Sequence, residues 1–331
     1  MKKIDAVFEG GGVKGIGLVG AFSVIEEAGY TLQNIAGTSA GAIVAALIAA
    51  GYNAAEVKKI VEDLNFNQIM DEGWEDKIPL VGRFISLIHE KGIYEGVFFE
   101  NLIRKLLADK NIYTFKDLII EDNKDNPRYR YKLQVIASDL TAGRMMVLPR
   151  DIARFGIDPD DMDVAQAVRM SMSIPFFFEP VQLKDSDGKD HYIVDGGLLS
   201  NYPVWLFDDG TADPAWPTFG YNLVDPDQNE PHPINGPISM FKALFSTMME
   251  AHDARYIEAQ HFVRTIPIPT GGVHTTEFDI SAEKKAALYE SGREAARQFL
   301  ATWDFEEYKQ QFRASQVPSR TQRLWTEAEE A

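Results

Sequence analysis

The stretch IDAVFEGGGVKG, residues 4–15, joins a short apolar run to a glycine-rich turn. The apolar half predicts a β-strand that ends where the glycines begin. Behind the turn, apolar residues recur at helical spacing until a stop at Gly29, namely Leu18, Val19, Phe22 and Ile25. We therefore expect a strand, a tight glycine turn and a helix, in that order.

The same order of strand and helix repeats directly downstream. Residues 34–37 predict a second short strand, and residues 40–50 predict an apolar helix that ends at Gly51. Residues 57–64 follow with the spacing of an amphipathic helix. Alternation of strands and helices predicts the α/β class, with a mainly parallel central sheet on which the helices pack.

The middle and the C-terminal part of the chain add further elements to this unit. Alternating apolar residues predict strands, and apolar residues at helical spacing predict two more helices. In chain order, these elements are expected at 99–107 (helix), 131–137 (strand), 181–183 and 192–194 (a hairpin) and 289–303 (helix).

Two segments are candidate lids over a binding site. Residues 208–237 are rich in Pro, Asp, Gly and Asn and predict a long loop, within which 219–224 is a candidate strand. The apolar residues between 80 and 88 predict a surface helix that faces the core. The alternative for 80–88 is a flap whose apolar face meets lipid.

Composition excludes several classes of function. The 331 residues carry a formal net charge of −17, which argues against nucleic acid as a partner and against broad docking on anionic lipid. The chain has no cysteine, so disulfides and zinc–thiolate sites are excluded, as is a thiol nucleophile. Asp5 and Glu9 interrupt the apolar region that a signal peptide needs, and no apolar run reaches the length of a transmembrane helix. We expect a cytoplasmic protein.

The glycine turn has two interpretations, of which the first is a nucleotide site. Gly10, Gly12 and Gly15 satisfy the dinucleotide-binding pattern G-x-G-x-x-G. That site also needs an acidic residue at the end of the second strand, where this chain has Gly37-Thr38-Ser39 instead. A P-loop would need Ser or Thr after Gly-Lys, and Lys14 precedes a glycine. The remaining interpretation is an oxyanion hole, in which backbone N–H groups bind a developing negative charge.

The second strand leads into Gly37-Thr38-Ser39-Ala40-Gly41, which has the pattern G-x-S-x-G. In a nucleophile elbow, this pattern places a serine on a sharp turn between a strand and a helix, at the carboxyl edge of the sheet. The N-terminus of the following helix carries a partial positive charge that favours an oxyanion beside the serine. The position of Ser39 between an expected strand and an expected helix makes it the candidate nucleophile.

A serine nucleophile needs a base, and the six histidines lie in no compelling motif; His191 is interpreted as a residue on the surface of the hairpin. Asp195 ends an apolar strand and opens the motif Asp195-Gly196-Gly197. A carboxylate is a weak base at its ordinary pKa of about 4, so partial burial would have to raise its pKa.

The three motifs together resemble the patatin-like phospholipase family. The glycine turn follows the first strand, the serine elbow follows the second, and Asp-Gly-Gly comes late in the core. Two more stretches are similar to that family: Ser171-Met172-Ser173-Ile174-Pro175-Phe176 and Leu198-Leu199-Ser200-Asn201-Tyr202-Pro203. The resemblance covers residues 4–208.

The resemblance implies a three-layer α/β/α fold and a Ser-Asp dyad, with Ser39 as nucleophile and Asp195 as base. It implies an oxyanion hole in the turn at 10–15, chiefly from the N–H groups of Gly11 and Gly12, and neither a metal nor a cofactor. Lys14 is expected to hold that turn or a lipid phosphate. The full set of implied site residues is Ser39 and Asp195; Gly10, Gly11, Gly12, Val13, Lys14 and Gly15; Gly37, Thr38, Ala40 and Gly41; and Gly196 and Gly197.

The resemblance also implies a substrate and a domain organisation. Members of the family cleave fatty-acyl esters of phospholipids, lysophospholipids or neutral lipids, so a lipid ester substrate and transient contact with a membrane surface are expected. We expect a catalytic core at 4–208, an extension packed on it at 209–315 and a polar tail at 316–331. The alternatives are a general carboxylesterase or thioesterase with the same dyad, a lipid-binding regulatory protein without turnover, and a Ser-His-Asp hydrolase.

Overall fold

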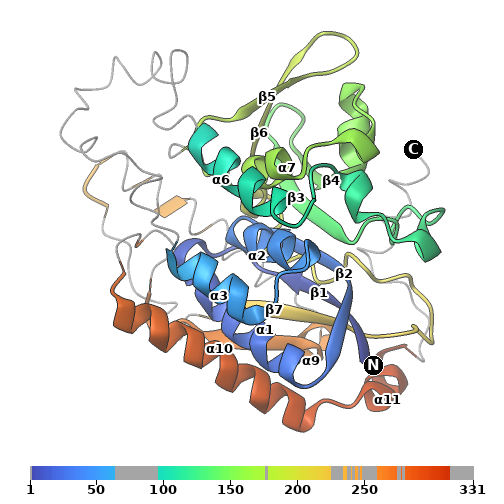
Figure 1. The fold of residues 1–331 in the computed structure, drawn as a ribbon, viewed down its shortest axis with the longest axis vertical. Helices are drawn as coiled ribbons and strands as arrows, with labels where there is room; N and C mark the ends of the chain where they lie inside the picture. The colour runs from blue at the N-terminus through green and yellow to red at the C-terminus, as the bar shows by residue number, and fades with distance from the viewer. Residues whose placement is uncertain are drawn as a thin grey trace.

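A mainly parallel β-sheet forms the centre of the molecule (Figure 1). The structure, a computed structural model, describes residues 2–63, 96–175, 178–224, 259–273 and 280–313, together with 234–236, 240, 243, 244, 247 and 277. Its strands are β1 (Lys2–Phe8), β2 (Tyr30–Thr38), β3 (Leu133–Asp139), β4 (Arg144–Leu148), β5 (Val181–Lys184), β6 (Asp190–Asp195), β7 (Thr218–Val224) and β8 (Thr265–Pro269).

Hydrogen-bonded neighbours follow the order β5-β6-β3-β2-β1-β7-β8, in which β2 and β6 pair with successive parts of β3, and β4 pairs with β3 as well. The five strands from β3 to β8 in this order are parallel to one another, whereas β4, β5 and β6 pair antiparallel. The predicted α/β class with a mainly parallel central sheet is confirmed.

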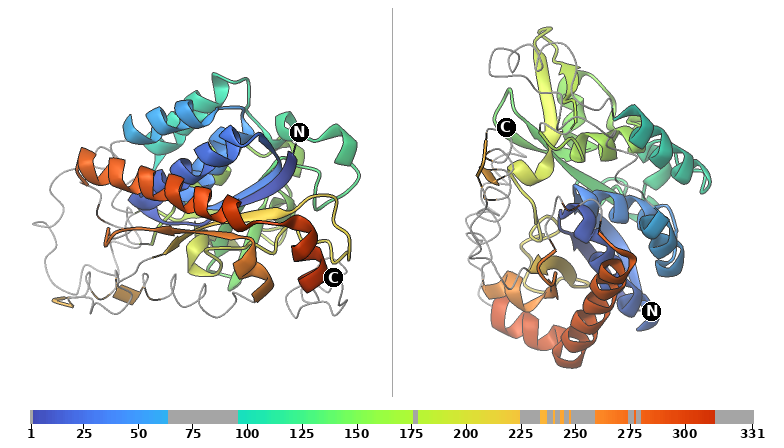
Figure 2. Two further views of the ribbon diagram at one scale, coloured as in Figure 1. Left: turned by 90° about the horizontal axis from the view of Figure 1, so that it is seen from below. Right: turned by 90° about the vertical axis from the view of Figure 1, so that its left-hand side faces the viewer.

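Most of the described helices cover one face of this sheet (Figure 2). Their apolar residues join the main core cluster with β1, and α10 packs along α1. The other face is covered by the segment Tyr202–Phe207, and α9 lies on this side. The helices are α1 (Gly15–Glu27), α2 (Ala40–Ala49), α3 (Ala54–Asp63), α6 (Val97–Ala108), α7 (Val164–Ser171), α9 (Ala259–Val263), α10 (Ala282–Thr302) and α11 (Phe305–Tyr308).

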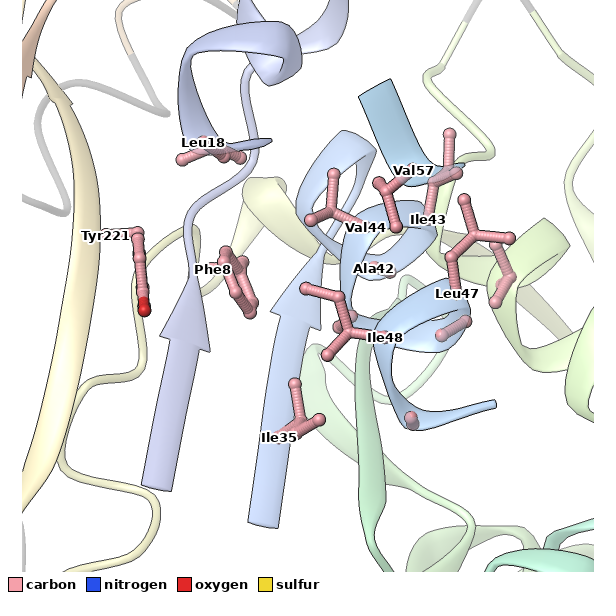
Figure 3. Packing of buried hydrophobic residues seen from close by; sticks show 14 of the residues in the cluster. Phe8, Leu18, Ile35, Ala42, Ile43, Val44, Leu47, Ile48, Val57 and Tyr221 are labelled. Atoms are coloured by element: carbon pink, nitrogen blue, oxygen red, sulfur yellow. The ribbon is translucent and has the colours of Figure 1, made fainter. Parts of the chain in front are cut away.

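Successive side chains of β1 point to opposite faces of the sheet and so belong to two different core clusters. Ile4, Ala6 and Phe8 face the helices, whereas Val7 faces the segment Tyr202–Phe207. Figure 3 shows Phe8 between the second strand and Tyr221, against whose ring it stacks with centroids 4.3 Å apart. The end of β1, where the glycine turn begins, is therefore fixed by packing on both sides.

Helix α2 is buried along its whole length, because every residue from Ala40 to Ala49 lies in the core. A helix that is apolar all round must be enclosed by other elements. Its first turn lies directly over the end of β1, where a side chain on Gly41 would collide with the carbonyl groups of Phe8 and Glu9. Only glycine allows the start of α2 to approach the glycine turn this closely.

The predicted elements within the described residues are present, with shifted ends. The strand expected at 131–137 is β3, which begins at Leu133, since Tyr131 instead forms an isolated bridge with Ile119. The candidate strand at 219–224 is β7, which pairs directly with β1 in the middle of the sheet. The prediction for 80–88 falls outside the described residues, as does the part of the 208–237 loop at 225–233.

Candidate active site

The ends of β2 and β6 meet on one edge of β3. Thr38, the last residue of β2, pairs with Ile136, and Asp195, the last residue of β6, pairs with the next residue, Ala137. Strand β4 occupies the opposite edge over these positions, so β2 and β6 must share the same edge. Because β2 is parallel and β6 antiparallel to β3, their carboxyl ends face each other. Ser39 and Asp195 are thereby brought together from positions far apart in the sequence.

Ser39 lies on the turn between β2 and α2 with backbone angles φ 53° and ψ −127°. A non-glycine residue at positive φ is uncommon and costs on the order of 1–3 kcal/mol, which the surrounding structure must offset. This conformation between a strand and a helix is the geometry expected of a nucleophile elbow. Ser39 is also the N-cap residue of α2, so the positive end of the helix dipole lies beside it.

A turn at the end of α7 contacts both Ser39 and Asp195. The Ser39 N–H donates to the Ser171 hydroxyl at 2.9 Å, and the Asp195 N–H donates to the Ser173 carbonyl at 2.9 Å. The Ser39 hydroxyl lies 3.6 Å from the sulfur of Met172, to which it donates. The similarity of residues 171–176 to the family had suggested no role for these side chains.

The Asp195 carboxyl group is fully buried. Its Oδ1 accepts from the Gly197 N–H at 2.8 Å, while Oδ2 has no hydrogen-bond partner within the described part of the chain. Burial raises the pKa of Asp195 to about 7, although the Ser39 hydroxyl and the Gly197 N–H act in the opposite direction. Asp195 therefore has the burial that a carboxylate needs to act as a base, and its raised pKa suits proton transfer near neutral pH.

The glycine turn lies against the serine elbow. A side chain on Gly10 would meet the Cβ atom of Ser39 and the carbonyl of Thr38, so the two motifs are in contact. The Gly10 N–H donates a hydrogen bond to the Asn201 carbonyl at 3.2 Å. By contrast, the N–H groups of Gly11 and Gly12 have no acceptor among the residues that the structure describes. These two amides are the ones expected to bind an oxyanion.

Glu9 anchors this turn, and sequence reasoning assigned it no role. Its buried carboxylate accepts from the Asn201 side chain at 3.1 Å, the Asn222 side chain at 2.8 Å and the Leu223 N–H. Asn201 also donates to the Gly10 carbonyl at 3.1 Å. The only signal in the sequence was an acidic residue that ends an apolar strand directly before the glycines.

Neither described histidine contacts Ser39. His191 lies on the hairpin, partly exposed, and bonds to Asp139 at 2.7 Å and to Asp185 at 3.2 Å, two contacts that the sequence did not predict. Hydrogen bonding to Asp139 raises its pKa. His261 lies 3.7 Å from Asp208. The other four, His89, His232, His252 and His274, lie outside the described residues.

Two further features bear on the class of site. Within the described ranges, no group of three or more His, Asp and Glu side chains could hold a metal ion. Among the same residues, no helix has the length and apolar character needed to cross a membrane. Lys14 lies in the short helical turn at Gly12–Lys14, half-buried, and forms no ion pair with any described residue.

The fold and the site together define the class of this protein. It is an α/β protein whose mainly parallel sheet carries Ser39 on a strand–helix turn, next to a glycine turn and a buried carboxylate. The sequence model of the family Patatin-like phospholipase matches residues 6–208, and the chain belongs to that family. The matched region contains the glycine turn, Ser39 and Asp195. Membership supports lipid acyl hydrolase activity in general terms.

Relatives extend the likeness over most of the chain. "Uncharacterized protein YqhO" from Bacillus subtilis is 41% identical over 303 residues, which cover 91% of this chain and 99% of that protein. Human "Patatin-like phospholipase domain-containing protein 6" is 26% identical over 202 residues, 61% of this chain but only 12% of that protein. The crystal structure of VipD from Legionella pneumophila shares the fold, with a TM-score of 0.52, 20% identity and coverage of 91% of this chain and 67% of that one.

Proposed function

We propose that this protein is a serine lipid acyl hydrolase that cleaves fatty-acyl esters of phospholipids or lysophospholipids through Ser39 and Asp195. The observation that carries the proposal is the meeting of β2 and β6 on consecutive residues of β3. It brings the residue after Thr38 and the carboxylate of Asp195 to one point of the sheet. Family membership supports the ester of a lipid as the substrate class.

In the first half of the reaction, the Asp195 carboxylate accepts the proton of the Ser39 hydroxyl as the serine oxygen attacks the ester carbonyl carbon. The carbonyl oxygen becomes an oxyanion, which the N–H groups of Gly11 and Gly12 bind, assisted by the dipole of α2. Loss of one donor from such a site typically lowers the rate by about 10²–10³-fold. The tetrahedral intermediate then collapses, and Asp195 returns the proton to the departing alcohol or lysolipid.

In the second half, water hydrolyses the acyl-enzyme. Asp195 takes a proton from the water, the hydroxide attacks the acyl carbonyl carbon, and the same amides stabilise the second oxyanion. Release of the fatty acid returns the proton to Ser39. All of these proton transfers use side chains of this chain.

The proposed setting is the cytoplasm, with transient contact at a lipid surface. The absence of cysteine fits a reducing compartment, and the net charge of −17 suits a protein that meets an anionic bilayer only briefly. Because Ser39 is buried, a conformational change must open access to its hydroxyl before an ester can bind.

The test compares the wild type with Ser39→Ala and with the matched control Ser23→Ala. Ser23 is equally buried, in α1, and its hydroxyl donates to the Gly20 carbonyl, away from the candidate site. A fluorophosphonate probe should label the wild type and the control but not Ser39→Ala. Mass spectrometry of a mixed lipid extract should show free fatty acid released by the same two proteins. Equal release by wild type and Ser39→Ala would refute the proposal.

The alternatives predict different results in the same experiment. A carboxylesterase or thioesterase would label at Ser39 but prefer short soluble esters or thioesters to aggregated phospholipid. A regulatory protein that binds lipid without turnover would not label at all. A Ser-His-Asp hydrolase would lose labelling in a His191→Gln or His261→Gln variant, or in variants of the other histidines, and keep it in Asp195→Asn.

A further inference from the structure

We infer that Ser171 is a positioning residue that sets the orientation of the Ser39 backbone, and that the turn 171–173 fixes the spacing between Ser39 and Asp195. The inference rests on the proposed function, since it concerns the reactivity of Ser39. It assigns a role to side chains that no motif identified as functional.

The Ser171 hydroxyl bridges two backbone groups at the point where β2 leaves the sheet. It accepts from the Ser39 N–H at 2.9 Å and donates to the Ile136 carbonyl at 2.5 Å. Thr38 is the last residue of β2 to pair with β3, so regular ladder hydrogen bonding stops one residue before Ser39. A hydroxyl suits this position because it donates and accepts through a single atom. The Ser171 hydroxyl therefore links the Ser39 N–H to the Ile136 carbonyl where the direct hydrogen bonds between β2 and β3 have ended.

The other end of the turn holds the base. The Ser173 carbonyl accepts from the Asp195 N–H at 2.9 Å, so two residues of one turn each fix the backbone of one member of the candidate dyad. Ser171 and Ser173 are both completely buried. The distance between nucleophile and base then depends on a three-residue segment as well as on the register of β3.

Arg169 holds this turn in place from inside the protein. Its guanidinium donates to the Ser173 hydroxyl and, at 2.9 Å, to the Glu179 carbonyl, and it is only 4% exposed. The Ser173 hydroxyl in turn donates to the Arg169 carbonyl at 2.8 Å. These contacts fix the residues after α7 to Arg169 within the helix. The Ser173 carbonyl is thereby held towards the Asp195 N–H.

The test is Ser171→Ala, with Ser23→Ala as the matched control. The Ser23 hydroxyl also bridges a donor and an acceptor, since it donates to the Gly20 carbonyl at 2.7 Å and accepts from Arg293 at 2.6 Å, but it lies in α1 away from the site. We expect Ser171→Ala to lower the rate of fluorophosphonate labelling and kcat by about 10- to 100-fold, with KM changed by less than about 2-fold. Ser23→Ala should leave both rates near those of the wild type.

A second measurement does not depend on activity. Hydrogen exchange, read at the Ser39 amide by fragmentation mass spectrometry, should be faster in Ser171→Ala than in the wild type or in Ser23→Ala, because the amide has lost its acceptor. Unchanged exchange at this amide would overturn the inference, whatever the rates. If the wild type itself neither labels nor hydrolyses lipid, the proposed function fails, and the exchange result alone decides the role of Ser171.

Discussion

Thr38 and Asp195 are the last residues of two strands that meet head to head on one edge of β3, pairing with the adjacent residues Ile136 and Ala137. The relative position of the candidate nucleophile and base is therefore determined by the register of the sheet. A site built on strand ends is held more rigidly than one built on loops.

The pH dependence of activity should report the ionisation of Asp195. Because burial raises its pKa to about 7, the carboxylate is largely protonated below that pH and cannot accept the Ser39 proton. We expect kcat/KM for a soluble ester to rise with pH, to reach half of its plateau near pH 7 and to fall tenfold per pH unit in acid. A profile that is flat between pH 5 and pH 8 would contradict Asp195 as the base.

Replacement of Asp195, the proposed base, should stabilise the protein while it abolishes turnover. The folded-state pKa of Asp195, about 7, exceeds the unfolded value of about 3.9, so the folded state holds more protons between these two pH values. The contribution of this carboxyl group to stability is thus fully present below pH 4 and is lost as pH rises through 7. Asp195→Asn stays neutral, and its side-chain oxygen can still accept from the Gly197 N–H.

We therefore expect Asp195→Asn to be more stable than the wild type at pH 8, by up to about 4 kcal/mol, and equally stable below pH 4. Urea unfolding of both proteins at pH 4 and pH 8 measures the difference. The same gap at both pH values would show that the substitution acts through packing and not through the charge.

Glu9 offers a test of how the glycine turn is held. In Glu9→Gln, an amide NH₂ replaces one of the oxygens that accept from Asn201, Asn222 and Leu223, so at least one buried donor loses its partner. We expect a loss of about 1–3 kcal/mol in unfolding free energy and a fall in kcat with little change in KM. The matched control is Glu27→Gln, an exposed carboxylate paired with Arg293, which should cost less than about 1 kcal/mol. Unchanged kcat in Glu9→Gln would show that the turn keeps its geometry without this carboxylate.

Local patterns in the sequence predicted the elements whose signal is local. The strand before the glycines, the buried helix after Ser39 and the hairpin ending at Asp195 each carry an apolar period that the fold uses directly. Strand β8 was not predicted because Pro267 and Pro269 argue against a strand. It lies at the end of the strand order, where both prolines are exposed and where β7 is its one partner among the described strands.

The partners of the candidate site residues could not be predicted in this way. Ser171 reaches Ser39 across 132 residues of sequence, and Asn222 reaches Glu9 across 213. Such pairings follow from sheet order and crossover connections, which no window of sequence contains. His191 illustrates the same point, since its hairpin was predicted but its pairing with Asp139 on β3 was not.

Substitutions in the charge network around Asp208 test how the segment after residue 208, beyond the region that the family model matches, is joined to the core. Asp208 accepts from Arg264 through both oxygens, at 2.7 and 2.6 Å, and from Arg313 at 2.6 Å, and all three side chains are buried. Burial alone would raise the pKa of Asp208, but the charges of Arg264 and Arg313, together with hydrogen bonds from His261 and Arg264, outweigh it and hold that pKa well below its ordinary value. This lowered pKa contributes stability that is present above about pH 4 and is lost as pH falls towards the folded-state pKa.

Two substitutions in this network should differ strongly because of what each leaves behind. Asp208→Asn leaves two buried guanidinium groups without their negatively charged partner and should cost about 3–5 kcal/mol of unfolding free energy at pH 7. Arg313→Met leaves the bidentate pair of Asp208 with Arg264 intact and neutral, so it should cost about 1 kcal/mol or less. Urea unfolding of the full chain at pH 7 measures both. If Arg313→Met proved as costly as Asp208→Asn, the packing of the segment after α11, and not the balance of buried charge, would be what joins the C-terminal part to the core.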